Sequence, residues 1–176
     1  DVYKRQLSYI LGLHGPCASY DTACSAALTA GHAGVRALQL DECAIGLVQS
    51  VAVMLAQGVG TSFAVAGMTS ARGCSHTFDV RADGYARGEA CGAVSLGCGN
   101  DGLCLQGSAV RQDGRSASLT APSGQAQQGL LVAALVDAGA SVTALVQTEA
   151  HGTGTALGDP IEAGSLAGAV LSARNE

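Results

Sequence analysis

The sequence predicts a layered α/β domain. Apolar, β-branched stretches alternate along the chain with stretches rich in Ala and Leu, which is typical of strands alternating with helices. Hydrophobic residues make up 48% of the 176 residues but aromatic residues only 3%, and there are 25 glycines, so the interior favours close helix–sheet packing. Charged residues are sparse at 13%, which indicates that part of the surface is buried against something outside this chain.

The first half of the chain is predicted to centre on one Ala-rich helix. Residues Leu7–Gly15 read as a short apolar strand or turn. A buried or half-buried helix is expected over Ser25–Leu40, where large apolar residues stand among small ones. The β-branched stretch Ala44–Met54 predicts a strand, and the Gly-, Ser-, Arg- and Asp-rich stretch Thr69–Glu89 predicts a long functional loop or a set of turns.

Two neighbouring strands and a junction are expected next. Gly92–Leu96 and Leu103–Val110 have strand-like composition, and Gly99-Asn100-Asp101-Gly102 supplies turn residues between them. Ser116–Gln125 is polar and contains Pro and Gly, so it predicts a junction between two parts of the domain.

The last third of the chain predicts a helix, a strand and a second helix. The first helix spans Ala126–Ala138 and stops at Gly139. An apolar strand is expected over Val142–Glu149. The second helix covers Pro160–Leu171, with Asp159 as a plausible N-cap.

Composition excludes several classes of function. The net charge is −5 and the nine basic residues are scattered, which argues against nucleic acid as a partner. No apolar run reaches the roughly 20 residues that a membrane span needs, and no signal peptide is recognised, so a cytoplasmic protein is expected.

The seven cysteines predict neither a metal site nor a disulfide framework. Their number is odd, and none form the paired spacings that zinc requires. Most are expected to be small buried hydrophobes in a reducing compartment. They are Cys17, Cys24, Cys43, Cys74, Cys91, Cys98 and Cys104.

Cys24 is the first candidate for chemistry. It stands at the start of the predicted Ala-rich helix, where the positive end of the helix dipole favours thiolate over thiol. Its neighbours Ala23 and Ser25 are small and leave the sulfur approachable. The alternative, a buried cysteine that opens a core helix, stays open on this pattern alone.

The second candidate is a Gly- and Thr-rich turn after an apolar strand, Glu149-Ala150-His151-Gly152-Thr153-Gly154-Thr155. The histidine can act as acid, base or electrostatic stabiliser, and the glycines let a substrate approach the backbone. A histidine that merely caps a tight turn is the alternative. Together with Cys24 this turn suggests Cys-based acyl chemistry, although 127 positions separate the two sites.

The sequence resembles the β-ketoacyl synthases, most of all those of modular and type I polyketide synthases. Four blocks follow in the family's order, and the resemblance extends from Leu7 to about Leu171. The blocks are DTACSAAL (Asp21–Leu28, after Gly15-Pro16), Phe78–Val94, Gly107–Gln127 and EAHGTGTALGDPIEA (Glu149–Ala163).

The resemblance implies a role for each candidate residue. Cys24 matches the nucleophile that receives an acyl group from the phosphopantetheine arm of acyl-carrier protein, and its backbone N–H would form half of an oxyanion hole. His151 matches one of two histidines that assist decarboxylation of a malonyl-type thioester. Thr153 and Thr155 match threonines that line the pantetheine channel. No cofactor is expected to bind the chain directly.

The resemblance also implies an incomplete thiolase-like fold with layers in the order α-β-α-β-α. Residues 7–125 would form the later part of the N-terminal half, and residues 126–176 would begin the C-terminal half. Residues 1–6 fit the pattern poorly and are a candidate cloning or assembly artefact. Family members dimerise through the first half, so a homodimer is expected for the full domain.

Several features of the family are missing. The portion before the cysteine motif, a second catalytic histidine in an NIGH-type loop, a supporting lysine and a glycine-rich oxyanion segment are not in this sequence. Gln49-Ser50-Val51 replaces a Gly-Gly-Val strand, and Ala26-Ala27 replaces two serines. The 176-residue chain by itself is therefore expected to be inactive and to aggregate or pack loosely.

Three other functions remain as alternatives. One is a different condensing enzyme, such as a fatty-acid elongating synthase. Another is a non-elongating scaffold that binds acyl-carrier protein without condensing. A Cys peptidase is the most distant, because nothing marks an Asn or Asp that would orient His151.

Overall fold

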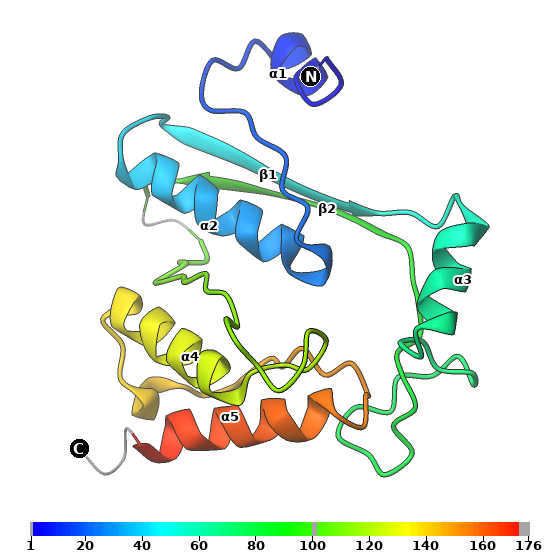
Figure 1. Cartoon of the computed structure of the whole chain (residues 1–176). Helices are drawn as coiled ribbons and strands as arrows, with labels where there is room; N and C mark the ends of the chain where they lie inside the picture. Colours follow the sequence, from blue (N-terminus) through cyan, green and yellow to red (C-terminus); the bar gives the residue numbers. More distant parts are fainter. Residues whose placement is uncertain (1, 100–101, 173–176) are drawn as a thin grey trace. The chain divides into compact units, whose positions relative to one another are not determined.

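Two parts of the chain form separate compact units. The structure is a computed structural model that describes residues 2–99 and 102–172. The first unit combines Asp1–Val53 with Glu89–Cys104, and the second combines Met54–Gly88 with Leu105–Glu176. Each unit is described by itself below, with the element labels of Figure 1.

The first unit contains an antiparallel pair of strands, β1 (Ile45–Ala52) and β2 (Ala90–Gly97). Both strands were predicted, and both are confirmed. The predicted partner of β2 is wrong, because β2 pairs with β1 and residues 103–110 form no strand. The turn expected at residues 99–102 includes Asn100 and Asp101, which lie outside the described residues.

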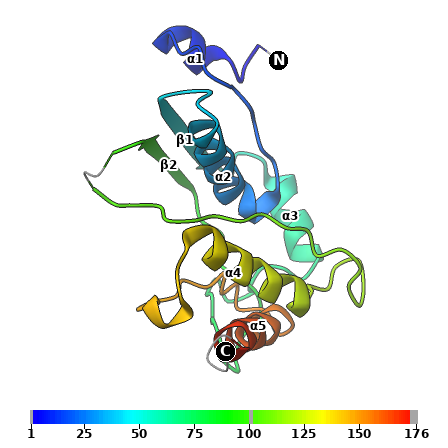
Figure 2. The ribbon, with the colours of Figure 1, turned by 90° about the vertical axis from the view of Figure 1, so that its left-hand side faces the viewer.

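Helix α2 (Ala26–Gln39) packs on the strand pair, and it confirms the predicted Ala-rich helix. Figures 1 and 2 both show α2 lying along β1. Close approach depends on Gly34, since a Cβ there would lie 3.1 Å from side-chain atoms of both Val48 and Leu96. This small-residue contact is the packing that the Gly- and Ala-rich composition predicts.

A short helix, α1 (Gln6–Leu11), precedes the strand pair. The strand or turn expected over Leu7–Gly15 is therefore wrong in its first part. Gly12 takes φ +65° and ends the helix in the left-handed region, and the N–H of Leu13 bonds to the carbonyl of Ser8 at 2.8 Å. Local hydrogen bonds satisfy this backbone, so it needs no strand partner.

The second unit contains three helices among its described residues, α3 (Gln57–Val65), α4 (Gly124–Ala138) and α5 (Gly158–Ser172). Helices α4 and α5 lie side by side in both ribbon views, and the buried Ser165 donates to the carbonyl of Gly124 at 3.2 Å. None of the helices in the described ranges is both long and apolar enough to cross a membrane.

The helix predictions in the second unit are mostly confirmed. Helix α4 stops where expected, at Gly139 with φ +59°. Helix α5 begins at Gly158, two positions before the expected start. Helix α3 was not predicted, because Gly58 and Gly60 lower the helical propensity of that stretch.

The strand predicted over Val142–Glu149 is wrong. Residues Val142–Ala144 form a 3₁₀ turn, in which the hydroxyl of Ser141 accepts from the N–H of Thr143, and residues 145–150 are irregular. A strand needs a neighbour for its N–H and C=O groups, and no described strand pairs with this segment. Apolar composition alone does not provide that neighbour.

The backbone of residues 107–108 contacts helix α4 and does not pair with a neighbouring strand. The N–H of Ser108 donates to Asp137 Oδ2 at 2.9 Å. Gly107 lies so close to α4 that a Cβ would sit 2.5 Å from the N of Ala138 and 2.8 Å from the O of Ala134. The backbone in the middle of the predicted strand thus lies against α4.

Gly107→Ala is expected to lower the free energy of unfolding of the complete synthase domain by about 2–3 kcal/mol, because α4 backbone cannot yield to the added methyl group. Thermal unfolding of the variant measures this. Gly58→Ala in α3 is the matched control, since nothing lies within 4 Å of its added Cβ. Equal melting temperatures for Gly107→Ala and the wild type would contradict the close approach.

Candidate active site

Cys24 lies at an exposed elbow that leads into α2. The 3₁₀ turn η1 (Ala23–Ser25) directly precedes the helix, and Cys24 is its middle residue. Ala23 has φ +54°, a left-handed conformation that costs a residue with a Cβ about 1 kcal/mol or more. The chain thus turns sharply at Ala23 and presents the Cys24 side chain at the N-terminal end of α2.

Local hydrogen bonds hold this elbow. The hydroxyl of Ser25 donates to the carbonyl of Thr22 at 2.9 Å and lies 2.9 Å from Thr22 Oγ1. Thr22 Oγ1 also lies 3.2 Å from Thr29 Oγ1, one turn into the helix. These contacts tie the elbow to the first turn of α2.

The turn that carries His151 is braced from helix α5. The N–H groups of His151 and Gly152 donate to the two carboxylate oxygens of Glu162, at 2.5 and 2.8 Å. Gly152 and Gly154 take φ +55° and +68°, which other residues rarely adopt, so the glycines are needed for this turn. His151 itself is exposed.

The two candidate threonines lie together in the same turn. Their hydroxyl oxygens, Thr153 Oγ1 and Thr155 Oγ1, are 3.2 Å apart, and both residues are half-buried. Thr155 Oγ1 also accepts from the N–H of Gly158 at 3.1 Å, so it satisfies the first N–H of α5. The structure therefore brings His151, Thr153 and Thr155 onto one braced turn.

Asp159 is not the N-cap that was predicted. It lies inside α5, and the residue is only 4% exposed. Its carboxylate accepts from the N–H groups of Gly154 at 3.0 Å, Thr155 at 3.2 Å and Phe78 at 2.6 Å. A buried carboxylate with three donors is well satisfied, and here it ties the His151 turn to a loop 81 positions earlier in the sequence.

The loop over residues 69–89 contacts the turn at two further points. The N–H of Gly84 donates to the carbonyl of Gly154 at 2.9 Å, and the hydroxyl of Thr77 donates to the carbonyl of Gly152 at 2.5 Å. Sequence reasoning missed Thr77, Asp159 and Glu162 as supporting residues. The spacing of the two carboxylates, three positions apart on one helix beside a Gly/Thr turn, was the available signal for the latter two.

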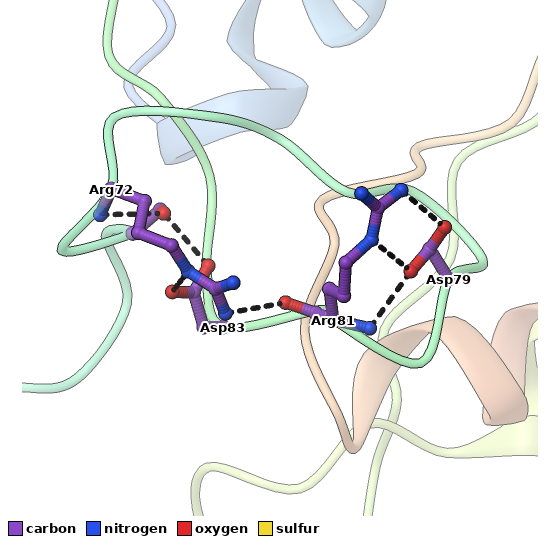
Figure 3. A network of polar contacts seen from close by, with 5 residues as sticks. Arg72, Asp79, Arg81 and Asp83 are labelled. Atoms are coloured by element: carbon purple, nitrogen blue, oxygen red, sulfur yellow. Dashed lines mark hydrogen bonds and ion pairs between the residues drawn. The ribbon is translucent and has the colours of Figure 1, made fainter.

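Two ion pairs order the same loop, as Figure 3 shows. Arg81 makes a two-pronged contact with Asp79, with both N···O distances at 2.9 Å. Arg72 Nε lies 2.9 Å from Asp83 Oδ2 and Arg72 donates to the carbonyl of Arg81 at 3.2 Å, while the hydroxyl of Ser70 donates to Asp83 Oδ1 at 2.7 Å. Both ion pairs therefore join residues of the loop to each other.

These contacts lower two pKa values. The hydrogen bond from Arg81 holds the pKa of Asp79 well below its ordinary value of 3.8. Hydrogen bonds from Ser70 and then from Arg72 lower the pKa of Asp83. Because the folded pKa lies below the unfolded one, the contacts stabilise the folded loop above about pH 3.8, and the contribution disappears as the pH falls through the folded pKa.

Arg81→Gln is expected to raise the pKa of Asp79 and so to raise the pH at which the loop loses order on acidification. Hydrogen exchange of peptides from residues 70–83 between pH 5 and about pH 2, corrected for intrinsic rates, measures this in the complete synthase. Arg115→Gln, outside the network, should leave the profile unchanged. Identical profiles for Arg81→Gln and the wild type would contradict the assignment.

Cys24 and the His151 turn belong to different units. Cys24 lies in the first unit, whereas His151, Thr153 and Thr155 lie in the second. The pairing of Cys24 with His151 therefore stays a prediction.

Comparison with known proteins decides the family. The sequence model described as "Beta-ketoacyl synthase, N-terminal domain" matches residues 5–99, and that described as "Beta-ketoacyl synthase, C-terminal domain" matches residues 103–176. The chain belongs to the β-ketoacyl synthase family. The resemblance predicted from the four sequence blocks is confirmed.

The relatives of this ketosynthase chain include modular polyketide synthases. It is 43% identical over 173 residues to erythronolide synthase EryA3 of Saccharopolyspora erythraea. The aligned residues cover 94% of this chain and 6% of the relative. A phenolphthiocerol/phthiocerol polyketide synthase of Mycobacterium tuberculosis is 42% identical over 178 residues, covering 97% of this chain and 9% of the relative. The ketosynthase chain thus spans less than a tenth of these relatives.

Solved ketosynthases share its fold. The ketosynthase from module 6 of the bacillaene synthase from Bacillus subtilis 168 has a TM-score of 0.93 at 32% identity, covering 99% of this chain and 33% of that one. The oxazolomycin ketosynthase domain OzmH KS7 of Streptomyces albus JA3453 has a TM-score of 0.91 at 32% identity, covering 97% and 31%. These structures confirm the predicted α/β, thiolase-like fold.

Proposed function

We propose that the complete synthase containing this chain catalyses decarboxylative Claisen condensation of an acyl group held on Cys24 with a malonyl-type thioester. The observation that carries the proposal is the exposed Cys24 on a strained elbow at the start of α2, within a chain of the ketosynthase family. A residue other than glycine keeps a left-handed backbone conformation only where the surrounding structure requires it. Such strained residues are concentrated at functional sites.

The first step loads the acyl chain. The Cys24 thiolate attacks the carbonyl carbon of an acyl thioester on the phosphopantetheine arm of acyl-carrier protein. The new C–S bond forms, the old one breaks, and the pantetheine sulfur leaves and takes up a proton. The backbone N–H of Cys24 is positioned in the turn η1 and would donate to the oxyanion in this step.

The second step forms the carbon–carbon bond. A malonyl-type thioester loses CO₂, and His151 donates a hydrogen bond to the developing enolate oxygen. The enolate carbon attacks the Cys24 thioester, the C–S bond breaks, and the product leaves as a β-ketoacyl thioester on the carrier protein. The bracing of the His151 backbone by Glu162 supports this role, because electrostatic stabilisation requires a donor held in place.

The two threonines would bind the pantetheine arm. Thr153 and Thr155 present adjacent hydroxyls on the turn that carries His151, so an arm bound there would end beside the imidazole. We infer that acyl-carrier protein and the acyl and malonyl-type thioesters are the partners, in a cytoplasmic homodimer. Charged residues make up only 13% of the chain, which supports the burial of further surface in the full assembly.

A single-turnover assay of the complete synthase tests the proposal. Radiolabelled acyl-carrier thioester and malonyl-carrier thioester are added in turn, and protein-bound label, CO₂ and β-ketoacyl product are measured. Release of CO₂ with product formation is expected. Carrier-protein binding with neither CO₂ nor product would instead support a non-elongating scaffold.

A further inference from the structure

Thr77 lies directly over the backbone that follows His151. Its hydroxyl donates to the carbonyl oxygen of Gly152 at 2.5 Å, across 75 positions of sequence. A Cβ built on Gly152 would lie 2.6 Å from Thr77 Cγ2, so the Thr77 methyl group fills the space beside this glycine. One side chain therefore contacts Gly152 with both its polar and its apolar branch.

The peptide groups at His151 and Gly152 are thus held from two sides. Glu162 on α5 accepts the N–H groups of His151 and Gly152, and Thr77 from the loop donates to the C=O of Gly152. The imidazole of His151 is attached to this backbone, and its own side chain is exposed. The direction in which the imidazole of His151 points depends on the orientation of the peptide groups at His151 and Gly152.

Thr77 itself has a fixed position. The next residue, Phe78, donates its N–H to the buried Asp159 at 2.6 Å, and Gly84 further along the loop donates to Gly154 at 2.9 Å. The loop is therefore joined to the turn at Gly152 and Gly154 and to α5 at Asp159, and Thr77 supplies the contact at the residue next to His151. Because Thr77 is exposed, changing it leaves no buried cavity.

We propose that Thr77 is a positioning residue for His151, which orients the imidazole for decarboxylation through its hydrogen bond to Gly152. The inference rests on the proposed function. It assigns no contact between Thr77 and substrate.

Two variants of the complete synthase separate the hydroxyl from the shape of the side chain. Thr77→Val keeps the branched shape but places a methyl group against the Gly152 carbonyl, whereas Thr77→Ser keeps the donor. We expect Thr77→Val to slow malonyl decarboxylation about fivefold, as loss of one net hydrogen bond implies, and to change acyl loading of Cys24 less than about twofold. Thr77→Ser should decarboxylate at nearly the wild-type rate.

A matched control and a double variant exclude a merely structural effect. Thr61 in α3 also donates to a carbonyl, that of Gln57 at 3.2 Å, but that bond stays within its own helix, so Thr61→Val should leave decarboxylation unchanged. In a His151→Ala background, Thr77→Val should slow the residual decarboxylation by no more than about 1.5-fold, because there is no imidazole left to position.

The outcomes distinguish the inference from the proposed function. Three results would overturn the role of Thr77 and leave the proposed function standing. They are a wild-type decarboxylation rate for Thr77→Val, equal slowing of loading and decarboxylation by Thr77→Val, and the same fivefold effect of Thr77→Val with and without His151. Wild-type synthase that releases no CO₂ would overturn the proposed function, and the role of Thr77 with it.

Discussion

Cys24→Ala should abolish acyl loading of the complete synthase, with condensation falling by more than about 1,000-fold, because no other group in the motif can form the thioester. The elbow places the Cys24 side chain at the exposed start of α2, between the small residues Ala23 and Ser25. In the wild type, a radiolabelled acyl thioester or a cerulenin-type epoxide should label this cysteine. Peptide mapping of the labelled protein measures both results.

The other cysteines provide the controls for this experiment. The prediction that most cysteines are buried is wrong: all of the seven except the half-buried Cys43 are exposed, because the described part of the chain buries very few side chains. Cys17 and Cys91 are thus as exposed as Cys24, so exposure alone would make all three reactive. Cys17→Ala and Cys91→Ala should each load acyl chains at the wild-type rate. Label on Cys17 or Cys91 with Cys24 untouched would refute the assignment of the nucleophile.

His151→Ala should reduce malonyl decarboxylation by about 100-fold or more while acyl loading of Cys24 changes less than about threefold. Loading requires the thiolate and the oxyanion hole, whereas decarboxylation requires a donor at the enolate oxygen, and removal of one such donor costs about 100- to 1,000-fold. Single-turnover measurements of protein-bound label and of released CO₂ follow the two steps separately.

A matched histidine tests whether the effect is specific. His14 is exposed and lies outside both the loop and the turn, and His14→Ala should leave both steps near their wild-type rates. Equal loss of loading and decarboxylation in His151→Ala would mean that His151 serves Cys24 or the fold. That result would also remove the basis for the role of Thr77.

Local sequence was enough to predict three of the helices, α2, α4 and α5. The Ala-rich pattern after Cys24 predicted α2, and the apolar face before Gly139 predicted α4, because helix hydrogen bonds join residues four apart and leave their periodicity in the sequence. The turn around His151 was also recognisable, since its glycines occupy left-handed positions that few other residues adopt. The family followed from four ordered blocks of residues.

Only the tertiary structure decided how the strands pair and what holds the site. Composition could not show that β2 pairs with β1, or that residues 142–149 have no described strand beside them, because strand partners lie far apart in sequence. The donors to Asp159 and the acceptor for Thr77 likewise lie up to 81 and 75 positions from these residues. The sequence by itself predicted Cys24 and His151 as the candidate residues for the chemistry. The hydrogen bonds around them depend on the folded chain, because no local pattern records a contact across such distances.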